Sequence, residues 1–211
     1  MELLNQIATS LQEGDDARVG ELTRQAVAEK IPARQILDEG LIAGMNVVGS
    51  LFRDHDIFLP DVLLAARAMY VGLDVLKPLL ASENVPTAGK VVIGTVQGDL
   101  HDIGKNLVGI MLRGAGFDVI DLGNDVAPEK FVETATRENA QVIGMSALLT
   151  TTMTGMQRVV ELIDAKGQRG RIKTIIGGAP VTAEYAREIG ADAFGFDAAS
   201  AVERVKELAA Q

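Results

Sequence analysis

A histidine with a carboxylate two residues before it stands at a predicted turn from a strand into a helix. Residues 98–108 read GDLHDIGKNLV, which places Asp99 and His101 between an apolar run and a helix-like stretch. The other histidine of the chain, His55, lies in an acidic segment, RDHDIF, and no spacing pairs it with His101. A single imidazole is too little for a zinc site built by the protein alone, which needs several ligands.

A metal that arrives inside a macrocycle is a different case, because the ring supplies the equatorial ligands and the protein adds an axial nitrogen. Asp99 would then accept a hydrogen bond from the imidazole of His101, fix its tautomer and raise its basicity. The pattern Asp-x-His-x-x-Gly is short, however, and a hydrogen-bonded loop histidine without a ligand is the simpler interpretation of these residues alone. Both alternatives stay open at this point.

The composition narrows the class of protein. The 211 residues carry a formal net charge of -9 and no block of like charges, which disfavours a nucleic-acid partner because such partners need a basic surface. No apolar run reaches about 18 residues, so no membrane span is expected, and the first residues lack the pattern of a signal peptide. The absence of cysteine excludes disulfides, thiolate metal sites and a cysteine nucleophile. We therefore expect a cytoplasmic protein with neither a nucleic-acid nor a membrane partner.

The chain is predicted to fold as two domains of different kinds. Residues 1–83 show helical spacing in four segments and almost no strand signal, which predicts a four-helix bundle. The polar residues 84–90 fit a linker between domains. In residues 91–211, short runs rich in valine and isoleucine alternate with helical stretches. This alternation predicts a doubly wound, flavodoxin-like α/β domain, whose five parallel strands are covered by helices on both faces.

Polar residues and glycines gather directly after the predicted strands. His101 follows the first strand, Ser146 the third, and Gly177 with Gly178 the fourth. The carboxyl ends of parallel strands lie at one edge of a doubly wound sheet, where such folds bind ligands. Glycine there lets a flat or phosphate-bearing ligand approach the backbone. The residues match neither the P-loop nor the dinucleotide fingerprint, so neither nucleotide site is predicted.

The stretch GTVQGDLHDIGKNLV resembles the signature of the cobalamin-binding domain of methionine synthase, of mutases of the methylmalonyl-CoA type and of methyltransferase corrinoid proteins. Further marks of that family match in the same order across nearly the whole chain, namely Ser146-x-Leu148, Thr150, Thr152 and Gly177-Gly178. The resemblance implies cobalamin or a related corrinoid as cofactor, with His101 as the axial ligand of its cobalt. It also implies Asp99 as the partner of that histidine, and Thr152 in the place of a serine that completes the relay.

By the same resemblance, the nucleotide tail of the cofactor lies in a slot between the sheet and its helices. The residues implied in the cofactor site, besides Asp99, His101 and Thr152, are Gly104, Ser146, Leu148, Thr150, Gly177, Gly178 and Ala198.

The segment AGMNVVGSLFRDHDIFLPDVLLAARAM resembles the helical cap that precedes this domain in methionine synthase and corrinoid proteins. Three apolar side chains shield the methyl group in that cap, at the positions of Phe52, Leu59 and Val62. A helix is expected to begin here, with Pro60 as its first residue and Leu59 at the N-cap position, although leucine caps poorly. An ordinary hydrophobic contact inside a bundle explains these apolar residues equally well if the resemblance is set aside.

The resemblance implies a corrinoid carrier protein of a methyltransferase system in one-carbon metabolism. The protein would accept a methyl group on cobalt(I) from a substrate-specific methyltransferase. It would then present methylcobalt(III) to a second methyltransferase, whose acceptor is tetrahydrofolate or coenzyme M. A reductive activator of the corrinoid is a further implied partner, and the chain would not be catalytic alone.

Three alternatives compete with the carrier. A cobalamin-dependent sensor or regulator shares the two domains, but such proteins usually add a DNA-binding module, for which this chain has neither basic charge nor spare length. A small mutase subunit is disfavoured by the helical cap. A flavodoxin-like regulatory domain without a cofactor leaves Asp99, His101 and the glycines at the strand ends unexplained.

Overall fold

The computed structural model describes residues 2–82 and 87–210. The chain folds into two compact units, residues 1–86 and residues 87–211, apart from Gly114–Gly116, which are grouped with the first unit. Residues 84–86 of the predicted linker lie outside the described residues, and Lys90 already begins the first strand.

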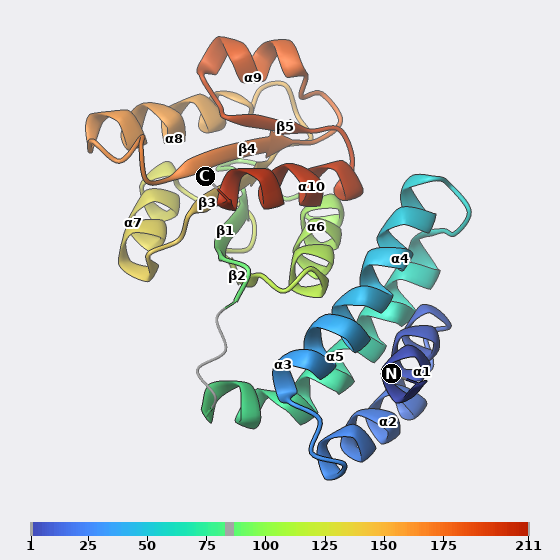
Figure 1. The fold of residues 1–211 in the computed structure, drawn as a ribbon. Helices are drawn as coiled ribbons and strands as arrows, with labels where there is room; N and C mark the ends of the chain where they lie inside the picture. The colour runs from blue at the N-terminus through green and yellow to red at the C-terminus, as the bar shows by residue number, and fades with distance from the viewer. Residues whose placement is uncertain (1, 83–86, 211) are drawn as a thin grey trace. The chain divides into compact units, whose positions relative to one another are not determined.

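The first unit is made of helices (Figure 1). They are α1 (Glu2–Gln12), α2 (Asp16–Ala28), α3 (Ala33–Gln35), η1 (Ile36–Ile42), α4 (Ala43–Arg53) and α5 (Leu59–Ser82). α3, η1 and α4 follow one another without a break, so residues 33–53 form one helical stretch whose middle, η1, is a π-helix. The four predicted helical segments therefore correspond to helices of this unit. None of the helices within residues 2–82 and 87–210 has the length and apolar character needed to cross a membrane.

The helical unit buries the apolar residues that recur with helical spacing. α1 buries Leu4, Ile7 and Leu11, which lie three and four residues apart and so share one face of the helix. α1 packs against α2, η1 and α4, and α2 packs against α5. Val62 and Met69 of α5 are among the buried side chains.

The start of α5 differs from the prediction that Leu59 is the N-cap residue. Leu59 is the first residue of the helix, and the backbone N–H of Phe58 donates to Asp61 Oδ2 at 2.9 Å. This bond is one half of a capping box, in which the third helical residue accepts from the N–H of the N-cap. The prediction was wrong by one residue because Pro60 suits any position of the first turn, where backbone N–H groups have no partner in the helix.

The second unit is built around a parallel sheet. Within the described residues, five strands form one sheet in the order β2-β1-β3-β4-β5, and every neighbouring pair is parallel. This is the flavodoxin-like order, as predicted. Its elements are β1 (Lys90–Thr95), α6 (Ile103–Gly114), β2 (Asp118–Asp121), α7 (Pro128–Glu138), β3 (Val142–Ser146), α8 (Thr154–Ala165), β4 (Lys173–Gly177), α9 (Ala183–Ile189), β5 (Ala193–Gly195) and α10 (Ala198–Ala209).

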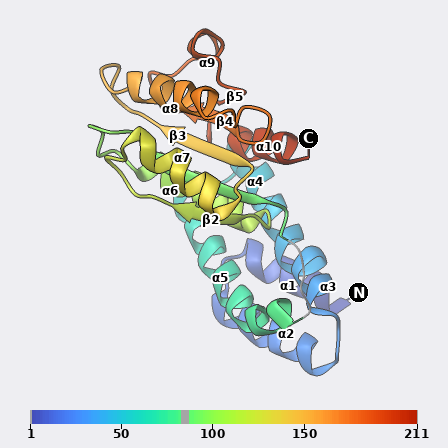
Figure 2. The same cartoon turned by 90° about the vertical axis from the view of Figure 1, so that its left-hand side faces the viewer.

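Helices cover both faces of this sheet (Figures 1 and 2). On one face Val92 of β1, Phe131 of α7 and Ile143 of β3 belong to one buried cluster. On the other face α6 comes so close that a Cβ at Gly109 would lie 2.7 Å from Ile93, and α10 packs against β4 and β5. Because successive side chains of a strand point to opposite faces, burial on both faces explains why the strands read as continuous apolar runs.

Candidate functional site

The loop between β1 and α6, residues 97–102, carries Asp99 and His101. The carboxylate of Asp99 is fully buried, and its Oδ1 accepts the backbone N–H of His101 at 3.0 Å. The same oxygen lies 2.8 Å from Nδ1 of the His101 ring. The side chain of Asp99 thus fixes both the backbone and the ring of the histidine, and it leaves Nε2 of the ring facing away from the carboxylate.

The second oxygen of Asp99 is held by the loop between β3 and α8. Oδ2 accepts the N–H of Leu148 at 2.8 Å and that of Leu149 at 3.2 Å. The hydroxyl of Thr152 lies 2.8 Å from the same oxygen, and it is also 2.8 Å from the carbonyl of Leu149. The structure therefore brings together Asp99, His101 and Thr152, the three residues that the resemblance grouped in a relay.

The charge of Asp99 is stabilised by these hydrogen bonds. Burial by itself would raise the pKa of the Asp99 carboxyl, since it disfavours the charged form. The N–H groups of Leu148 and His101, the ring of His101 and the hydroxyl of Thr152 all act in the opposite direction and hold the pKa well below its usual range. Asp99 is therefore a carboxylate near neutral pH and can only accept hydrogen bonds, so Nδ1 of His101 is the donor in their contact.

The surroundings of His101 fit a flat, largely apolar ligand. The side chain of His101 is 52% exposed, so its free nitrogen can be reached from outside the protein. Four large apolar side chains stay exposed at this edge of the sheet. Leu100 and Ile103 are close to His101 in the sequence, and Leu148 and Leu149 donate their backbone N–H groups to Asp99. Exposed apolar patches of this kind mark binding surfaces. A histidine nitrogen that can be reached from outside, with exposed aliphatic side chains nearby, would suit a macrocycle with a central metal.

The glycines predicted for the tail slot are needed at the end of β4. A Cβ at Gly178 would lie 1.9 Å from the carbonyl oxygen of Ala147, and its φ of +128° also excludes other residues. Gly177 pairs with Ser146 in the sheet, and its Cβ would lie 3.0 Å from the carbonyl of Gly195. These glycines let the loops after β3 and β4 approach closely.

The other predicted site residues of this unit differ in accessibility. Ala198 is buried as the first residue of α10, Ser146 is half-buried, and Thr150 and Gly104 are exposed. A Cβ at Gly104 would meet no atom within 4 Å, which leaves open space beside the histidine loop. The roles of all these residues toward a cofactor stay predictions.

Sequence reasoning missed a set of residues in β1, in α6 and at and after the end of β2 that hold the histidine loop or its surroundings. Thr95 is fully buried, and its hydroxyl donates to the carbonyl of His101 at 3.0 Å. Lys105 is buried in α6 and is paired with Asp121, while Asp125 accepts the N–H of Gly98. The acidic residues directly after the second predicted strand were a signal that was available but not used.

The residues predicted to shield a methyl group lie in the helical unit. Phe52 near the end of α4 and Leu59 at the start of α5 are partly exposed, whereas Val62 is fully buried. Their shielding role stays a prediction. His55 is exposed in the turn after α4, and across residues 2–82 and 87–210 no three acidic or histidine side chains gather as a metal site would need.

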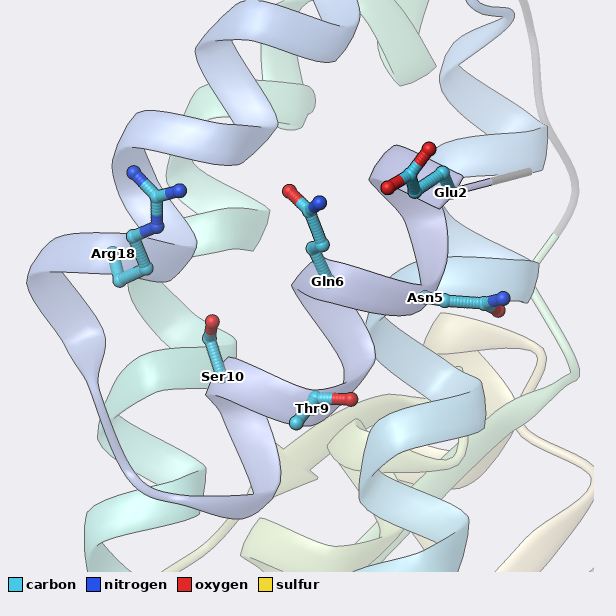
Figure 3. A pocket seen from close by; sticks show the side chains of 6 residues that line it. All are labelled: Glu2, Asn5, Gln6, Thr9, Ser10 and Arg18. Atoms are coloured by element: carbon cyan, nitrogen blue, oxygen red, sulfur yellow. The ribbon is translucent and has the colours of Figure 1, made fainter.

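A polar hollow of about 340 Å³ lies on the helical unit (Figure 3). Its lining side chain from α2 is Arg18, which is paired with Glu21 at 2.8 Å. The side chains that line this hollow are polar or charged, unlike the aliphatic side chains exposed near His101. The α1 residues that line it are Glu2, Asn5, Gln6, Thr9 and Ser10.

Comparison with known proteins agrees with this geometry. Residues 89–206 match a family model described as the B12 binding domain, and residues 3–77 match a second model with the same description. The chain belongs to the corrinoid protein family. This confirms the predicted resemblance, and with it cobalamin or a related corrinoid as the class of cofactor.

Relatives match over nearly their whole length. Dimethylamine corrinoid protein 3 of Methanosarcina acetivorans is 44% identical, with 98% of this chain and 96% of the relative covered. A corrinoid protein of Desulfitobacterium hafniense is 41% identical, with 99% and 98% covered. Among solved structures, the methanol:cobalamin methyltransferase complex MtaBC of Methanosarcina barkeri contains a chain with 32% identity and a TM-score of 0.88, with 99% of this chain and 80% of that chain covered. The predicted fold, a helical cap followed by a flavodoxin-like domain, is therefore confirmed.

Proposed function

We propose that this protein is the corrinoid carrier of a methyltransferase system. It accepts a methyl group from a substrate-specific methyltransferase and presents that group to a second methyltransferase, which uses tetrahydrofolate or coenzyme M. When bound, the corrinoid supplies a cobalt centre that can take up a methyl group and release it to a nucleophile. The relatives are named for dimethylamine, trimethylamine and methanol systems, which supports a small methylated amine or alcohol as the methyl source.

The single observation that carries this proposal is the Asp99–His101 pair. Its 2.8 Å contact supports a ring proton on Nδ1, which would leave Nε2 to hold the cobalt of the corrinoid. A partner that holds a metal-ligating histidine typically changes metal affinity by about 10- to 100-fold when it is removed. Thr152 holds Asp99 in turn, so the ligand rests on two successive hydrogen bonds.

The other residues of the site bind the ring and its surroundings. The aliphatic side chains of Leu100, Ile103, Leu148 and Leu149 are exposed and would pack against a bound corrin and exclude water from it. Phe52 and Leu59, which are partly exposed in the helical cap, and Val62, which is buried there, are the residues that we propose for shielding the methyl group. A reductive activator restores the carrier after accidental oxidation.

The decisive experiment identifies the axial nitrogen. The protein is loaded with cobalamin and reduced to the cobalt(II) state, in which electron paramagnetic resonance resolves coupling to an axial nitrogen. Growth with ¹⁵N-histidine should change the triplet splitting into a doublet, which the cofactor's own base cannot do. His101→Ala should abolish the doublet, and His55→Ala, which changes the exposed second histidine, should leave it intact.

Methyl transfer is then tested with the loaded protein and a methyltransferase for each small methylated amine or methanol. Turnover with one donor, followed in the visible spectrum, supports the carrier role. A triplet in the labelled wild-type protein would remove His101 from the site. A histidine doublet without methyl transfer from any donor would favour the sensor alternative.

A further inference from the structure

The histidine loop, residues 97–102, has a second support that the Asp99–Thr152 network does not include. The loop after β2, residues 121–125, reads DLGND and lies beside it. We call residues 121–125 the β2 loop. β2 and β3 flank β1 on opposite sides in the sheet, so the β2 loop and the loop after β3 reach the histidine loop from opposite sides.

The β2 loop binds the backbone of three consecutive residues of the histidine loop. Oδ1 of Asp125 accepts the N–H of Gly98 at 2.7 Å. The backbone N–H of Asp125 donates to the carbonyl of Asp99 at 3.0 Å. The side-chain amide of Asn124 donates to the carbonyl of Leu100 at 3.3 Å. Asp125 therefore makes two hydrogen bonds at this turn: its side chain accepts from Gly98, the residue before Asp99, and its backbone N–H donates to the carbonyl of Asp99.

The other end of the β2 loop is anchored to the helix that follows the histidine loop. Nζ of Lys105 in α6 lies 2.5 and 2.7 Å from the two oxygens of Asp121. The side chain of Lys105 is only 4% exposed, so the pair is shielded from solvent on the side of the cation. Asp121 Oδ1 also accepts the N–H of Gly123 at 2.9 Å, and Gly123 accepts the N–H of Thr95 at 2.9 Å. The β2 loop is therefore held by contacts of its own, which do not involve Asp99 or His101.

The backbone at the contact is unusual on both sides. Asp125 has a φ of +52° and Gly98 a φ of +82°. A residue other than glycine in the left-handed region persists where the surrounding structure requires it. Here the requirement is the short bond from Gly98 to the Asp125 carboxylate, which sets the direction in which the chain enters Asp99.

We propose that Asp125 is a positioning residue for the cobalt ligand. Its hydrogen bonds go to Gly98 and Asp99, so it acts by holding the backbone turn at Gly98 from which Asp99 and His101 are presented. The inference rests on the proposed role of His101 as axial ligand. Without Asp125, Asp99 keeps its side-chain partners, but the turn beneath it loses its acceptor, and the ring spends less time where Nε2 can reach the metal.

The size of the effect follows from the bond that is lost. A hydrogen bond to a charged acceptor has a net worth that corresponds to about tenfold or more in an equilibrium. Removal of the Asp125 carboxylate should therefore lower the population of the loop conformation that presents His101, and with it the ratio of histidine-bound to histidine-free cobalamin, by up to about tenfold.

The test compares Asp125→Gly, Asp125→Asn and a matched control, Asn139→Gly. Glycine adopts positive φ without strain, so Asp125→Gly removes the acceptor and leaves the backbone conformation accessible. Asn139 has a φ of +55° at the end of α7, and its side chain accepts from Arg171 at 2.9 Å. Asn139→Gly thus deletes the same kind of acceptor far along the chain from the histidine loop.

The readout is the ¹⁵N-histidine splitting of bound cobalt(II) cobalamin, titrated against added imidazole as a competing ligand. We expect Asp125→Gly to lower the histidine-bound ratio by up to about tenfold, Asp125→Asn to restore most of it, and Asn139→Gly to leave it unchanged. Urea midpoints of the apoproteins should fall by similar amounts in the two glycine variants, which separates positioning from stability.

The inference is overturned if Asp125→Gly keeps the wild-type histidine-bound ratio, or if Asn139→Gly lowers it equally. Failure of the proposed function looks different, because the labelled wild-type protein would then lack the doublet. Hydrogen exchange of the wild-type protein tests the contact without any variant. Gly98 N–H should exchange much more slowly than exposed amides, and rapid exchange would equally refute the role of Asp125.

Discussion

Replacement of Asp99 by asparagine tests the central hydrogen-bond arrangement while keeping the shape of the side chain. The carboxylate accepts on both oxygens, from His101 on one side and from Leu148, Leu149 and Thr152 on the other. An amide has one acceptor oxygen and one NH₂ group, so it cannot serve both sides. One set of donors must face the NH₂ group.

The donors around Asp99 determine which of its two sides would face the NH₂ group in Asp99→Asn. With the NH₂ group toward the β3 side, it would face two backbone N–H groups, those of Leu148 and Leu149. With the NH₂ group toward His101, it faces one backbone N–H and the ring nitrogen Nδ1. The second orientation is less costly because Nδ1 can become an acceptor. The ring proton then moves to Nε2, and the nitrogen that should bind cobalt no longer has a free lone pair.

Two magnitudes follow from this arrangement. Loss of the bond from the His101 N–H to a charged acceptor costs about 1.5–3 kcal/mol. The bonds that remain on a neutral amide are weaker than those on the carboxylate, whereas the lower desolvation of an amide offsets part of that loss. We therefore expect the free energy of unfolding of the apoprotein to fall by about 2–3 kcal/mol, and the histidine-bound fraction of cobalamin to fall more than about tenfold.

The pH dependence of the stability difference has a definite sign. The Asp99 pKa is held below its unfolded value, so its contribution to stability is present above the unfolded pKa and is lost as pH falls toward the folded one. The gap between wild type and Asp99→Asn should be full above about pH 5 and should shrink as pH falls below about 4.

Urea unfolding of the wild-type and Asp99→Asn apoproteins from pH 7 to pH 3 measures the difference in stability. The ¹⁵N-histidine splitting of the loaded proteins measures the histidine-bound fraction of cobalamin. The other carboxylates are common to the two proteins and cancel in the difference. A stability gap that widens toward acid pH would refute the charged state assigned to Asp99. A full histidine doublet in Asp99→Asn would refute the argument from the tautomer.

Two further predictions concern residues that support the site. Asp121→Asn should cost about 3 kcal/mol of stability and Lys105→Met about 1–2 kcal/mol. The reason is that Asp121→Asn removes the charged partner of the more buried group, since the side chain of Lys105 is 4% exposed and that of Asp121 is 28% exposed. Equal losses in urea titrations would contradict this reasoning. Gly178→Ala should destabilise the protein by about 2 kcal/mol or more, since its Cβ would lie 1.9 Å from the carbonyl oxygen of Ala147. It should also weaken cobalamin uptake, because Ala147 precedes Leu148, which binds Asp99; uptake equal to wild type in a spectroscopic titration would contradict that link.

The sequence was sufficient for most of the fold because each element carries its own signal. The strands are buried on both faces and therefore appear as short runs of valine and isoleucine, such as VVIGTV and IKTIIGG. The first turn of α5 was placed one residue late, since Leu59 and Pro60 fit either register, and the deciding bond is the one that the N–H of Phe58 donates to the carboxylate of Asp61. That bond depends on side-chain geometry that no spacing encodes.

The site was predictable in part. The Asp99–His101 pair is local, two residues apart, so its hydrogen bond could be foreseen from the spacing. Thr152 lies 53 residues from Asp99, and only the family resemblance linked the two. Lys105 and Asp125 carried no motif of their own. Their contacts span 16 and 27 residues: Lys105 in α6 meets Asp121 at the end of β2, and Asp125 meets Gly98 where two loops lie side by side.

The strand order gives the physical reason why the histidine loop can be held so firmly. β1 lies between β2 and β3, so the loop that leaves β1 has a neighbouring loop on each side at the same edge. The β3 side supplies donors to the Asp99 side chain, and the β2 side supplies partners for the backbone at Gly98, Asp99 and Leu100. A loop after an edge strand would have only one such neighbour. The side chain of Asp99 and the backbone that leads into His101 are therefore held from two sides by the protein itself, which would keep the orientation of His101 when it holds a metal.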